Sequence, residues 1–517
     1  MKKVEMVKRL YNDSLEMIDA RYKKNIIIIF FAIAFIAVSF KWSTVLLILT
    51  LIVWLSNVRF CIKYTKERIV LLLFHITYFI FLLGRPLISL LRPNENWIQI
   101  QIKGYKATEA SVFLTIFCML VSLISIRFGA EYVYTRKEKK EFPKVKEIEE
   151  KISGEWIILI RVLALVLFFI SSIFELTLGI EKLLFVLNNS YVELYSTFLS
   201  RMPYIVYVLS TFLSYSLAAY LATLPSKKMT YIVLGVYVFT ALPVTFCGGR
   251  TKIVQYLLLT LVYCVFRDYI SSEEKWFGKT AKILLAFAGT GGILALGMLN
   301  YVREGEYSWI NPFALFIDFF YKQGVSFSWL CGGFAHISNL QNMGVINYTF
   351  GGLIDYFLHG VIARYIFDAD SLPNTNSMLQ IIDGNSMDHH LSYVLLGKDV
   401  YLDGHGTGSS YLLETYTDYS MLGIILFSLL LGYTVIWIVK KSKSRWFARL
   451  ALFCSMGNLM TLPRSNAISP IEFLWKNSFW CMLLYLALGI LGRYIVLRIK
   501  QKKAEKGSPQ DCSQSKT

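Results

Sequence analysis

The sequence predicts an all-α polytopic membrane protein that crosses a lipid bilayer about twelve times. Two observations predict this fold class. The 517 residues are 55% hydrophobic and only 17% charged, whereas a soluble globular domain carries roughly 25% charged residues. The apolar residues also recur in runs that approach the roughly 20 residues a helix needs to cross a bilayer core of about 30 Å. Lipid is therefore the natural solvent for this chain.

Twelve apolar runs are candidates for spanning helices, nine before residue 300 and three after residue 410. Helices fit runs of this length, and strands do not. The runs cover residues 25–40, 43–60, 69–91, 108–126, 157–179, 204–224, 229–247, 252–269, 281–299, 411–439, 446–463 and 472–497. They divide the chain into a first group of helices over 25–299 and a second group over 411–497.

The lysines and arginines give this arrangement a direction. If the N-terminal segment 1–24 is cytoplasmic, the cytoplasmic segments together hold 37 of the 53 Lys and Arg residues. Cytoplasmic loops of membrane proteins carry such an excess of positive charge. Both the N-terminus and the tail, 498–517, are therefore predicted in the cytoplasm. The net charge of +18 is explained by topology, and we do not expect nucleic acid as a partner.

One large extracytoplasmic loop, 300–410, separates the two groups of spans. Two stretches in it, 313–334 and 346–367, are apolar enough to touch the membrane. They are amphipathic helices on the outer face, re-entrant elements, or a further pair of spans that would raise the count to fourteen. No internal repeat is visible in the sequence, which weakens the interpretation as a transporter built from inverted repeats.

The turn Cys247-Gly248-Gly249-Arg250-Thr251-Lys252 is the sharpest local feature, and it falls at the outer surface. Two glycines permit a tight turn, and the helix that follows directs its positive dipole end at the same place. Arg250 and Lys252 add fixed positive charge. The combination predicts a site for phosphate or pyrophosphate, although an interfacial arginine whose side chain only reaches toward water gives the same pattern.

Three more arginines lie near the outer interface on separate elements. Arg303 follows the ninth span, Arg364 lies in the second apolar stretch of the outer loop, and Arg464 ends the eleventh span. Charges placed among apolar residues at a membrane usually have a partner or a task. We expect these arginines to converge with Arg250 on one polyanion.

A glycine-spaced loop, 403–410, runs into the tenth span and carries candidate acid–base groups. Asp403 and His405 lie in the loop, and Glu414 and Asp418 share one face of the following helix. Such groups accept or donate protons in catalysis. The spacing of the nearby Asp and His residues matches no closed metal motif, and the eight cysteines form no CxxC pair. We therefore expect neither a metal nor a cofactor.

These stretches carry a resemblance to a known family. The Gly-Gly-Arg turn at 248–250, the single large outer loop, and the run Gly-His-Gly-Thr-Gly-Ser-Ser at 404–410 followed by Glu414, Asp418 and Gly423 resemble the Wzy-type O-antigen polymerases. The resemblance covers the topology of nearly the whole chain, whereas its specific motifs cover only about 247–254 and 403–423.

The resemblance implies a GT-C-like membrane glycosyltransferase of the bacterial inner membrane that works without a metal. Its substrates would be oligosaccharide repeat units linked to undecaprenyl pyrophosphate, which it would polymerise at the outer face into O-antigen, capsule or exopolysaccharide. Arg250, Lys252, Arg303 and Arg464, with Arg364 as a weaker candidate, would then bind the departing pyrophosphate. His405, Asp403 and Glu414, in that order, would assist the acceptor hydroxyl. A flippase and a chain-length regulator of the same pathway are the implied protein partners.

Four other function classes stay open at this point. An O-antigen ligase shares the architecture and differs in its acceptor, which this sequence does not reveal. A flippase or exporter would carry charges deep in several spans, whereas the notable charges here, apart from Arg85, Arg161 and Glu175, gather at the outer face. A receptor or scaffold would carry a cytoplasmic signalling domain, and an acyltransferase would carry a His-Asp pair facing an acyl donor. The polymerase is the preferred function.

Overall fold

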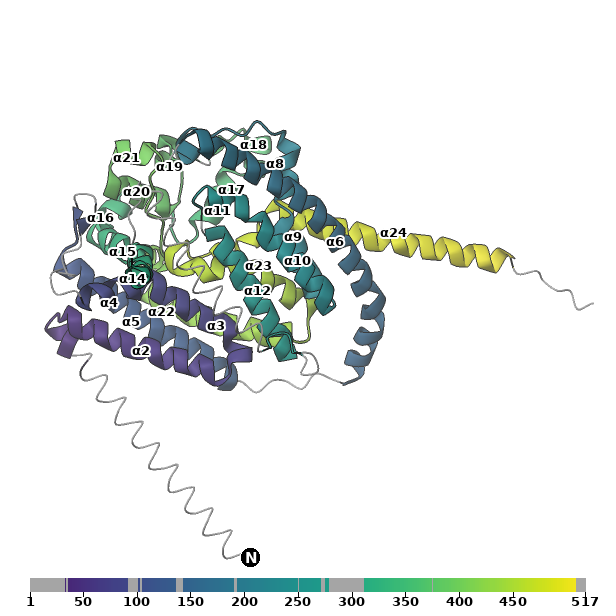
Figure 1. Cartoon of the computed structure of the whole chain (residues 1–517), viewed down its shortest axis with the longest axis horizontal. Helices are drawn as coiled ribbons and strands as arrows, with labels where there is room; N and C mark the ends of the chain where they lie inside the picture. The colour runs from purple at the N-terminus through teal and green to yellow at the C-terminus, as the bar shows by residue number, and fades with distance from the viewer. Residues whose placement is uncertain are drawn as a thin grey trace, which may run out of the picture.

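The computed structural model is almost entirely helical (Figure 1). It describes residue 33 and the ranges 36–91, 101–102, 105–135, 143–189, 193–249, 251–270, 275–278, 311–373 and 375–507. Within these residues, the extended structure is one antiparallel pair, β1 (Gln101–Ile102) and β2 (Tyr105–Lys106). The prediction of an all-α protein is confirmed for the described part of the chain.

Nine helical segments of the described residues are long and apolar enough to cross a membrane. The chain is a multi-pass membrane protein. The nine segments are formed by α2 (Ser43–Lys63), α3 (Thr65–Tyr78) with the π-helical turn η1 (Phe79–Leu83) and α4 (Gly84–Leu91), α5 (Glu109–Thr135), α6 (Pro143–Asn188), α8 (Tyr204–Ser210) with α9 (Leu213–Ala222), α10 (Lys227–Thr240) with α11 (Leu242–Phe246), α12 (Thr251–Ile270), α22 (Tyr411–Ser442) and α24 (Asn477–Gly507).

The remaining three predicted spans have different outcomes. The span expected at 446–463 is α23 (Trp446–Thr461), a helix of 16 residues that continues into the 3₁₀ turn η2 (Leu462–Arg464). A second 3₁₀ segment, η3 (Ser469–Leu474), then leads to α24. The spans predicted at 25–40 and 281–299 lie mostly or entirely outside the described residues. The count of twelve therefore stays a prediction.

The described part of the predicted outer loop forms short helices. None of them alone reaches the length of a span, and whether this segment lies on the surface or enters the bilayer stays a prediction. They are α14 (Pro312–Gln323), α15 (Val325–Ala335), α16 (Ile337–Gln341), α17 (Gly351–His359), α18 (Val361–Phe367), α19 (Met378–Ile382), α20 (Met387–Leu396) and α21 (Lys398–Leu402).

Helices α5 and α22 form the tightest pair of the bundle. A Cβ atom on Gly129 would lie 2.0 Å from the carbonyl oxygen of Leu429, and a Cβ atom on Gly432 would lie 2.0 Å from that of Ile126. Ser122 Oγ lies 2.7 Å from the Tyr411 hydroxyl and adds a hydrogen bond across the pair. Small residues that let backbones approach closely, with polar side chains bonded across the contact, are the usual means of joining membrane helices.

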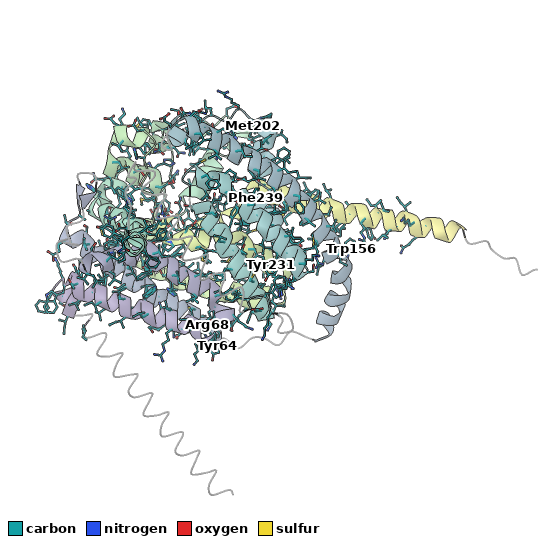
Figure 2. All side chains as sticks on the ribbon, in the orientation of Figure 1. Tyr64, Arg68, Trp156, Met202, Tyr231 and Phe239 are labelled. Carbon is teal, nitrogen blue, oxygen red and sulfur yellow. The ribbon has the colours of Figure 1, made fainter. Side chains whose placement is uncertain are left out.

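A cluster of cations and aromatic rings closes the end of this bundle that is predicted to be cytoplasmic. The Arg68 guanidinium lies 3.6 Å from the ring centroid of Phe60 and 4.7 Å from those of Tyr64 and Tyr134; Figure 2 labels Tyr64 and Arg68 at this end. Arg127 also lies over the Phe60 ring, at 3.5 Å. Such contacts are electrostatically favourable, and basic residues with aromatic rings are typical of a membrane–water interface.

A second group of helices, α6, α8, α9, α10, α11 and α12, packs beside the group that contains α2, α3, α5 and α22. Helix α23 lies between the groups because it packs on both α22 and α12. Helix α24 is the least buried span, and its far end projects away from the other helices in Figure 1.

Candidate functional site

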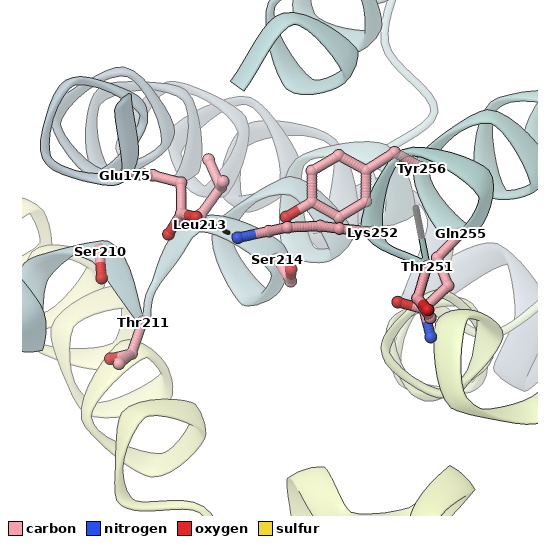
Figure 3. Close-up of a pocket in the computed structure, with 9 residues that line it drawn as sticks. All are labelled: Glu175, Ser210, Thr211, Leu213, Ser214, Thr251, Lys252, Gln255 and Tyr256. Atoms are coloured by element: carbon pink, nitrogen blue, oxygen red, sulfur yellow. Dashed lines mark hydrogen bonds and ion pairs between the residues drawn. The ribbon is translucent and has the colours of Figure 1, made fainter. Parts of the chain in front are cut away.

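A polar pocket of about 440 Å³ lies within the second group of helices (Figure 3). Leu213 is the one apolar side chain among its nine described lining residues. The others are Glu175, Ser210, Thr211, Ser214, Thr251, Lys252, Gln255 and Tyr256. Polar and charged side chains inside spanning helices are costly and face a cavity or a partner. The pocket therefore stands out chemically from the apolar helices that form it.

Interrupted helices form the walls of this pocket. The span at 204–222 breaks between α8 and α9 at Thr211 and Phe212, and the two hydroxyl residues Ser210 and Thr211 line the pocket at that break. On the opposite wall, Gly248 takes a φ of 103° and turns the chain into α12, whose first residue, Thr251, also lines the pocket. Broken helices at membrane depth are tolerated where they line a cavity.

An ion pair crosses the pocket from α6 to α12. The Lys252 ammonium contacts the Glu175 carboxylate, and their side chains are 30% and 14% exposed. Figure 3 shows both side chains reaching into the pocket from opposite helices. A half-buried pair of this kind loses much of its hydration and gives weak evidence of a purely stabilising role. It places one cation and one carboxylate in the same cavity.

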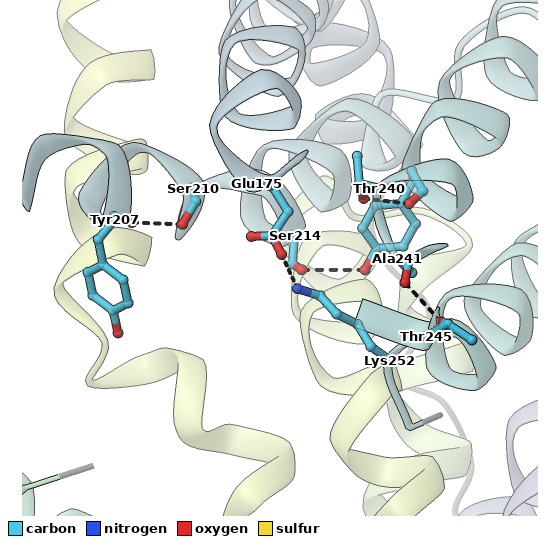
Figure 4. A network of polar contacts seen from close by, with 9 residues as sticks. Glu175, Tyr207, Ser210, Ser214, Thr240, Ala241, Thr245 and Lys252 are labelled. Carbon is cyan, nitrogen blue, oxygen red and sulfur yellow. Dashed lines mark hydrogen bonds and ion pairs between the residues drawn. The ribbon is translucent and has the colours of Figure 1, made fainter. Parts of the chain in front are cut away.

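An aromatic pair and an amide fix the remaining wall. The rings of Tyr237 and Tyr256 stack with their centroids 3.6 Å apart, and the hydroxyls of Tyr237 and Ser214 lie 3.4 Å apart; Figure 4 shows Ser214 beside the ion pair. Gln255 Nε2 donates to the carbonyl oxygen of Gly457 at 3.0 Å. Through Gln255 the pocket is joined to α23, near the end of the helix that leads to Arg464.

The glycine-spaced loop and Glu414 form a separate, tightly packed cluster. Glu414 is fully buried, and Ser409 Oγ and the backbone N–H of Ala467 donate to its two carboxylate oxygens at 2.6 and 2.7 Å. Gly408, with a φ of 76°, lies against the backbone of Arg464. These contacts hold the loop 403–410 and the chain after α23 together.

The predicted pyrophosphate-binding residues occupy different environments. Lys252 lines the pocket, whereas Arg250 and Arg303 lie outside the described residues. Arg464 is half-buried, with its guanidinium 5.2 Å from the ring centroid of Phe81. Arg364 is exposed on α18. The structure brings together the backbone of Arg464 and the glycine loop, and it gives no contact between Arg364 and Lys252.

The other two candidates for acid–base catalysis, Asp403 and His405, do not line the pocket. Asp403 is exposed at the end of α21, and the backbone carbonyl of His405 accepts a hydrogen bond from Asn376 at 2.9 Å. Asp418, on the same helix as Glu414, accepts hydrogen bonds from the backbone N–H groups of Tyr348 and Thr349. It therefore anchors the segment before α17.

The His389-His390 pair is part of the packed outer segment. His389 Nδ1 lies 2.8 Å from the Tyr401 hydroxyl. The His390 ring is fully buried, and its Nε2 lies 3.0 Å from the carbonyl oxygen of Ile381. Burial lowers the pKa of His390 below its ordinary value. In the described part of the chain, no three His, Cys, Asp or Glu side chains are grouped to hold a metal ion.

Glu175 and Gln255 are pocket residues that the sequence-based site did not include. A signal for Glu175 exists, because it is the one charged residue in the apolar stretch 162–180. An ionisable residue inside a spanning helix is itself a reason to expect a function. The hydrogen bonds of Gln255 carry no comparable signal, since glutamine near a helix start is common on any surface.

Comparison with known proteins gives a family match that extends along nearly the whole sequence. A family model described as O-antigen polysaccharide polymerase Wzy matches residues 22–493, nearly the whole chain. A search of curated proteins and a search of solved structures found no match.

Proposed function

Because the chain belongs to the O-antigen polysaccharide polymerase family Wzy, we propose that it extends a surface polysaccharide by glycosyl transfer from an undecaprenyl pyrophosphate carrier. The family supports polymerisation of oligosaccharide repeat units in the membrane. The proposal adds the carrier, the outer face of the bacterial inner membrane as the place of reaction, and the site. The growing chain would leave its carrier and join the non-reducing end of a new lipid-linked unit.

The observation that carries this proposal is the charged pocket beside the start of α12. Lys252 lies in the first turn of a 20-residue helix, where the backbone N–H groups and the helix dipole favour an anion. The departing pyrophosphate develops negative charge, which a cation in a poorly solvated site stabilises. Lys252 is therefore our first candidate for binding the leaving group.

The predicted arginines are assigned by their distance along the chain from this pocket. Arg250 directly precedes α12 and would share the leaving group with Lys252. Arg464 follows α23, and α23 contacts the pocket residue Gln255 at Gly457, so a second phosphate contact from this side is geometrically reasonable. Arg303 and Arg364 stay weaker proposals.

The polar lining of the pocket suits a sugar. Hydroxyl, amide and carboxylate groups from the four helices α6, α8, α9 and α12 face the cavity, and each can donate to or accept from a sugar hydroxyl. A small number of placed polar groups fixes the orientation of a bound ligand. The lipid tail would lie outside the pocket, against the apolar faces of the helices.

The wider setting follows from the same proposal. The termini would lie in the cytoplasm, and the segment 300–410 would lie outside. A flippase would deliver the lipid-linked units to the outer face, and a chain-length regulator would act on the product. The substrate then meets the pocket from the bilayer, because its carrier never leaves the membrane.

Replacing Lys252 by alanine tests the site. We expect polymerisation to fall by roughly 10²-fold or more, the usual cost of one lost stabilising contact to a developing negative charge. The measurement is the ladder of polysaccharide lengths in cells whose own copy has been deleted. Single lipid-linked repeat units should accumulate at the outer face in the Lys252→Ala cells.

Lys476→Ala is the matched control, because Lys476 also forms an ion pair, with Glu472, but these side chains lie outside the pocket and are more exposed, at 49% and 36%. It should give a wild-type ladder, as should Lys252→Arg in large part. The amount of each protein in the membrane is measured alongside. A wild-type ladder from Lys252→Ala would remove this residue from the site, and units accumulating on the inner face would point to a flippase.

A further inference from the structure

We propose that Glu175 receives the proton of the acceptor hydroxyl, and that the ion pair between Glu175 and Lys252 opens when the pyrophosphate of the donor binds Lys252. This inference rests on the proposed function and adds a catalytic residue and an order of events to it. It depends on the pocket, the ion pair and the surroundings of the other candidate carboxylates.

The surroundings of each carboxylate decide which one can act. Glu414 is fully buried, and a hydroxyl and a backbone N–H occupy its two oxygens. Asp403 is exposed and does not line the pocket. Glu175 lines the pocket, is partly accessible, and contacts the side-chain ammonium of Lys252. A general base has to reach the proton that it removes, so the position of a carboxylate matters before its pKa when the base is identified.

The two members of the ion pair differ in how easily they can separate. Lys252 is the more exposed member, at 30% against 14%, and its ammonium stands on a flexible chain of four carbons. A pyrophosphate at the start of α12 presents several negative oxygens to this ammonium, whereas Glu175 presents two. The ammonium would turn toward the phosphate oxygens, and the Glu175 carboxylate would face the cavity.

The walls near Glu175 suit an acceptor sugar. Ser210, Thr211 and Ser214 line the same cavity, and Figure 4 shows Ser210, Ser214 and Glu175 on neighbouring helices around it. Ser210 Oγ donates its proton to the carbonyl oxygen of Tyr207 at 2.8 Å, which leaves its oxygen free to accept from a sugar hydroxyl. The acceptor would lie between these hydroxyls and Glu175, with the donor on the Lys252 side.

The reaction balances with these groups alone. The acceptor oxygen forms a bond to the anomeric carbon of the donor sugar while the bond from that carbon to the pyrophosphate oxygen breaks. The electron pair of the broken bond leaves with the pyrophosphate, next to Lys252. The acceptor proton passes to the Glu175 carboxylate and then to water when the product moves on. After the carrier pyrophosphate departs, Lys252 returns to Glu175.

The test separates donor binding from turnover. Purified protein in lipid nanodiscs is given lipid-linked repeat units extracted from cells that lack the polymerase, and both the retained units and the polymer formed are measured. In Glu175→Gln we expect binding that is unchanged or a few-fold tighter, because Lys252 is no longer paired. Turnover should fall by about 10²- to 10⁴-fold, the range of general acid–base catalysis.

Three further variants complete the experiment. Lys252→Met should weaken binding, and Glu472→Gln, which neutralises the exposed pair with Lys476, should resemble the wild type in both measurements. Formate added to Glu175→Ala should restore part of the turnover, because it returns a carboxylate to the pocket. If the glutamine variant fails to fold, Glu175→Asp replaces it, with the same expectation of retained binding and reduced turnover.

The outcomes distinguish the two levels of the proposal. Glu175→Gln with turnover within threefold of wild type overturns the inference and leaves the proposed function intact. Loss of binding and turnover together in a folded Glu175→Gln, with no effect of formate, assigns Glu175 a structural role and also overturns it. A wild-type protein that binds the units and forms no polymer overturns the proposed function, and the inference falls with it.

Discussion

At the scale of single residues, the nature of the partner separates a structural carboxylate from a reactive one. Glu414 accepts from Ser409 and from the backbone of Ala467, and a backbone N–H cannot move away when a substrate arrives. Glu175 is paired with a lysine side chain, and a lysine side chain can move away when a substrate arrives. In the sequence, both are acidic residues within or next to apolar runs. The difference depends on contacts 53 and 77 positions away, which no local pattern contains.

The histidines illustrate the same limit. Five of the six histidines fall within 300–410, and the sequence makes His405 the first candidate for the acceptor proton. The structure assigns contacts within the packed segment to His389 and His390. Local sequence predicted that this segment is ordered and polar, but the direction of each ring is set by short helices whose packing is not visible in the sequence.

Burial of His390 predicts a loss of stability in acid. Its pKa is lowered in the folded protein, so below about pH 6.5, the ordinary value for histidine, the unfolded chain binds a proton that the folded chain does not. Unfolding then becomes easier as the pH falls, and the effect is absent above that value. Thermal unfolding in detergent between pH 7.5 and 5 should show a shallower pH dependence for His390→Gln than for the wild type.

A matched variant at His359, which lies at the end of α17, provides the control. His359→Gln should keep the pH dependence of the wild-type protein. If His390→Gln and the wild type lose stability in parallel, the burial of the His390 ring is not the cause.

At the scale of helices, hydropathy predicted the spans well and their interruptions poorly. The runs from 43 to 269 and at 411–439 each correspond to a helical segment, because about twenty apolar residues have one stable form in lipid. The break at Ala241 is followed by Pro243, which cannot donate a helical hydrogen bond, whereas those at Thr211 and at Ser420, where φ is 55°, have no comparable signature. Asp418, just before the last of these, is engaged by the segment at 348–349, so a tertiary contact accompanies the break.

The close approach of α5 and α22 makes a prediction at this scale. Gly432→Ala should lower the thermal stability, since its new Cβ would overlap the carbonyl oxygen of Ile126 and overpacking costs about 1–3 kcal/mol. Gly235→Ala is the matched control, because no atom lies within 4 Å of a Cβ there and alanine favours a helix by about 1 kcal/mol. Fluorescence-detected unfolding in detergent compares the two; equal stability would contradict the packing described.

At the scale of the whole molecule, the distribution of Lys and Arg along the chain predicts that all parts of the candidate site lie on the same side of the membrane. The start of α12, the segment 311–410 and the chain after α23 all fall on the predicted outer side. The family match over 22–493 agrees with a catalytic unit that extends through nearly the whole chain. Residues 250 and 303 lie outside the described part, so the arginine contribution to this face is still a prediction.

Substituted cysteines test the sidedness directly. Asp399 and Ser444 are exposed and belong to segments predicted on opposite sides. In a background with the exposed Cys481 and Cys512 replaced, Asp399→Cys should react with an impermeant thiol reagent in intact cells, and Ser444→Cys only after lysis. The reverse pattern would invert the topology and place the pocket on the cytoplasmic side.

The interrupted helices around the pocket let one enzyme offer a polar cavity to a sugar and an apolar outer surface to a lipid tail. At the junction of α8 and α9, Ser210 and Thr211 line the cavity, whereas the outer surfaces of the same helices carry large hydrophobic side chains; Tyr207 on α8, for example, is 52% exposed. A substrate with a sugar head and a hydrocarbon tail can therefore keep each part in surroundings like those it came from. The sugar does not have to enter the lipid, and the tail does not have to enter water. Successive repeat units can reach the pocket by lateral diffusion in the membrane.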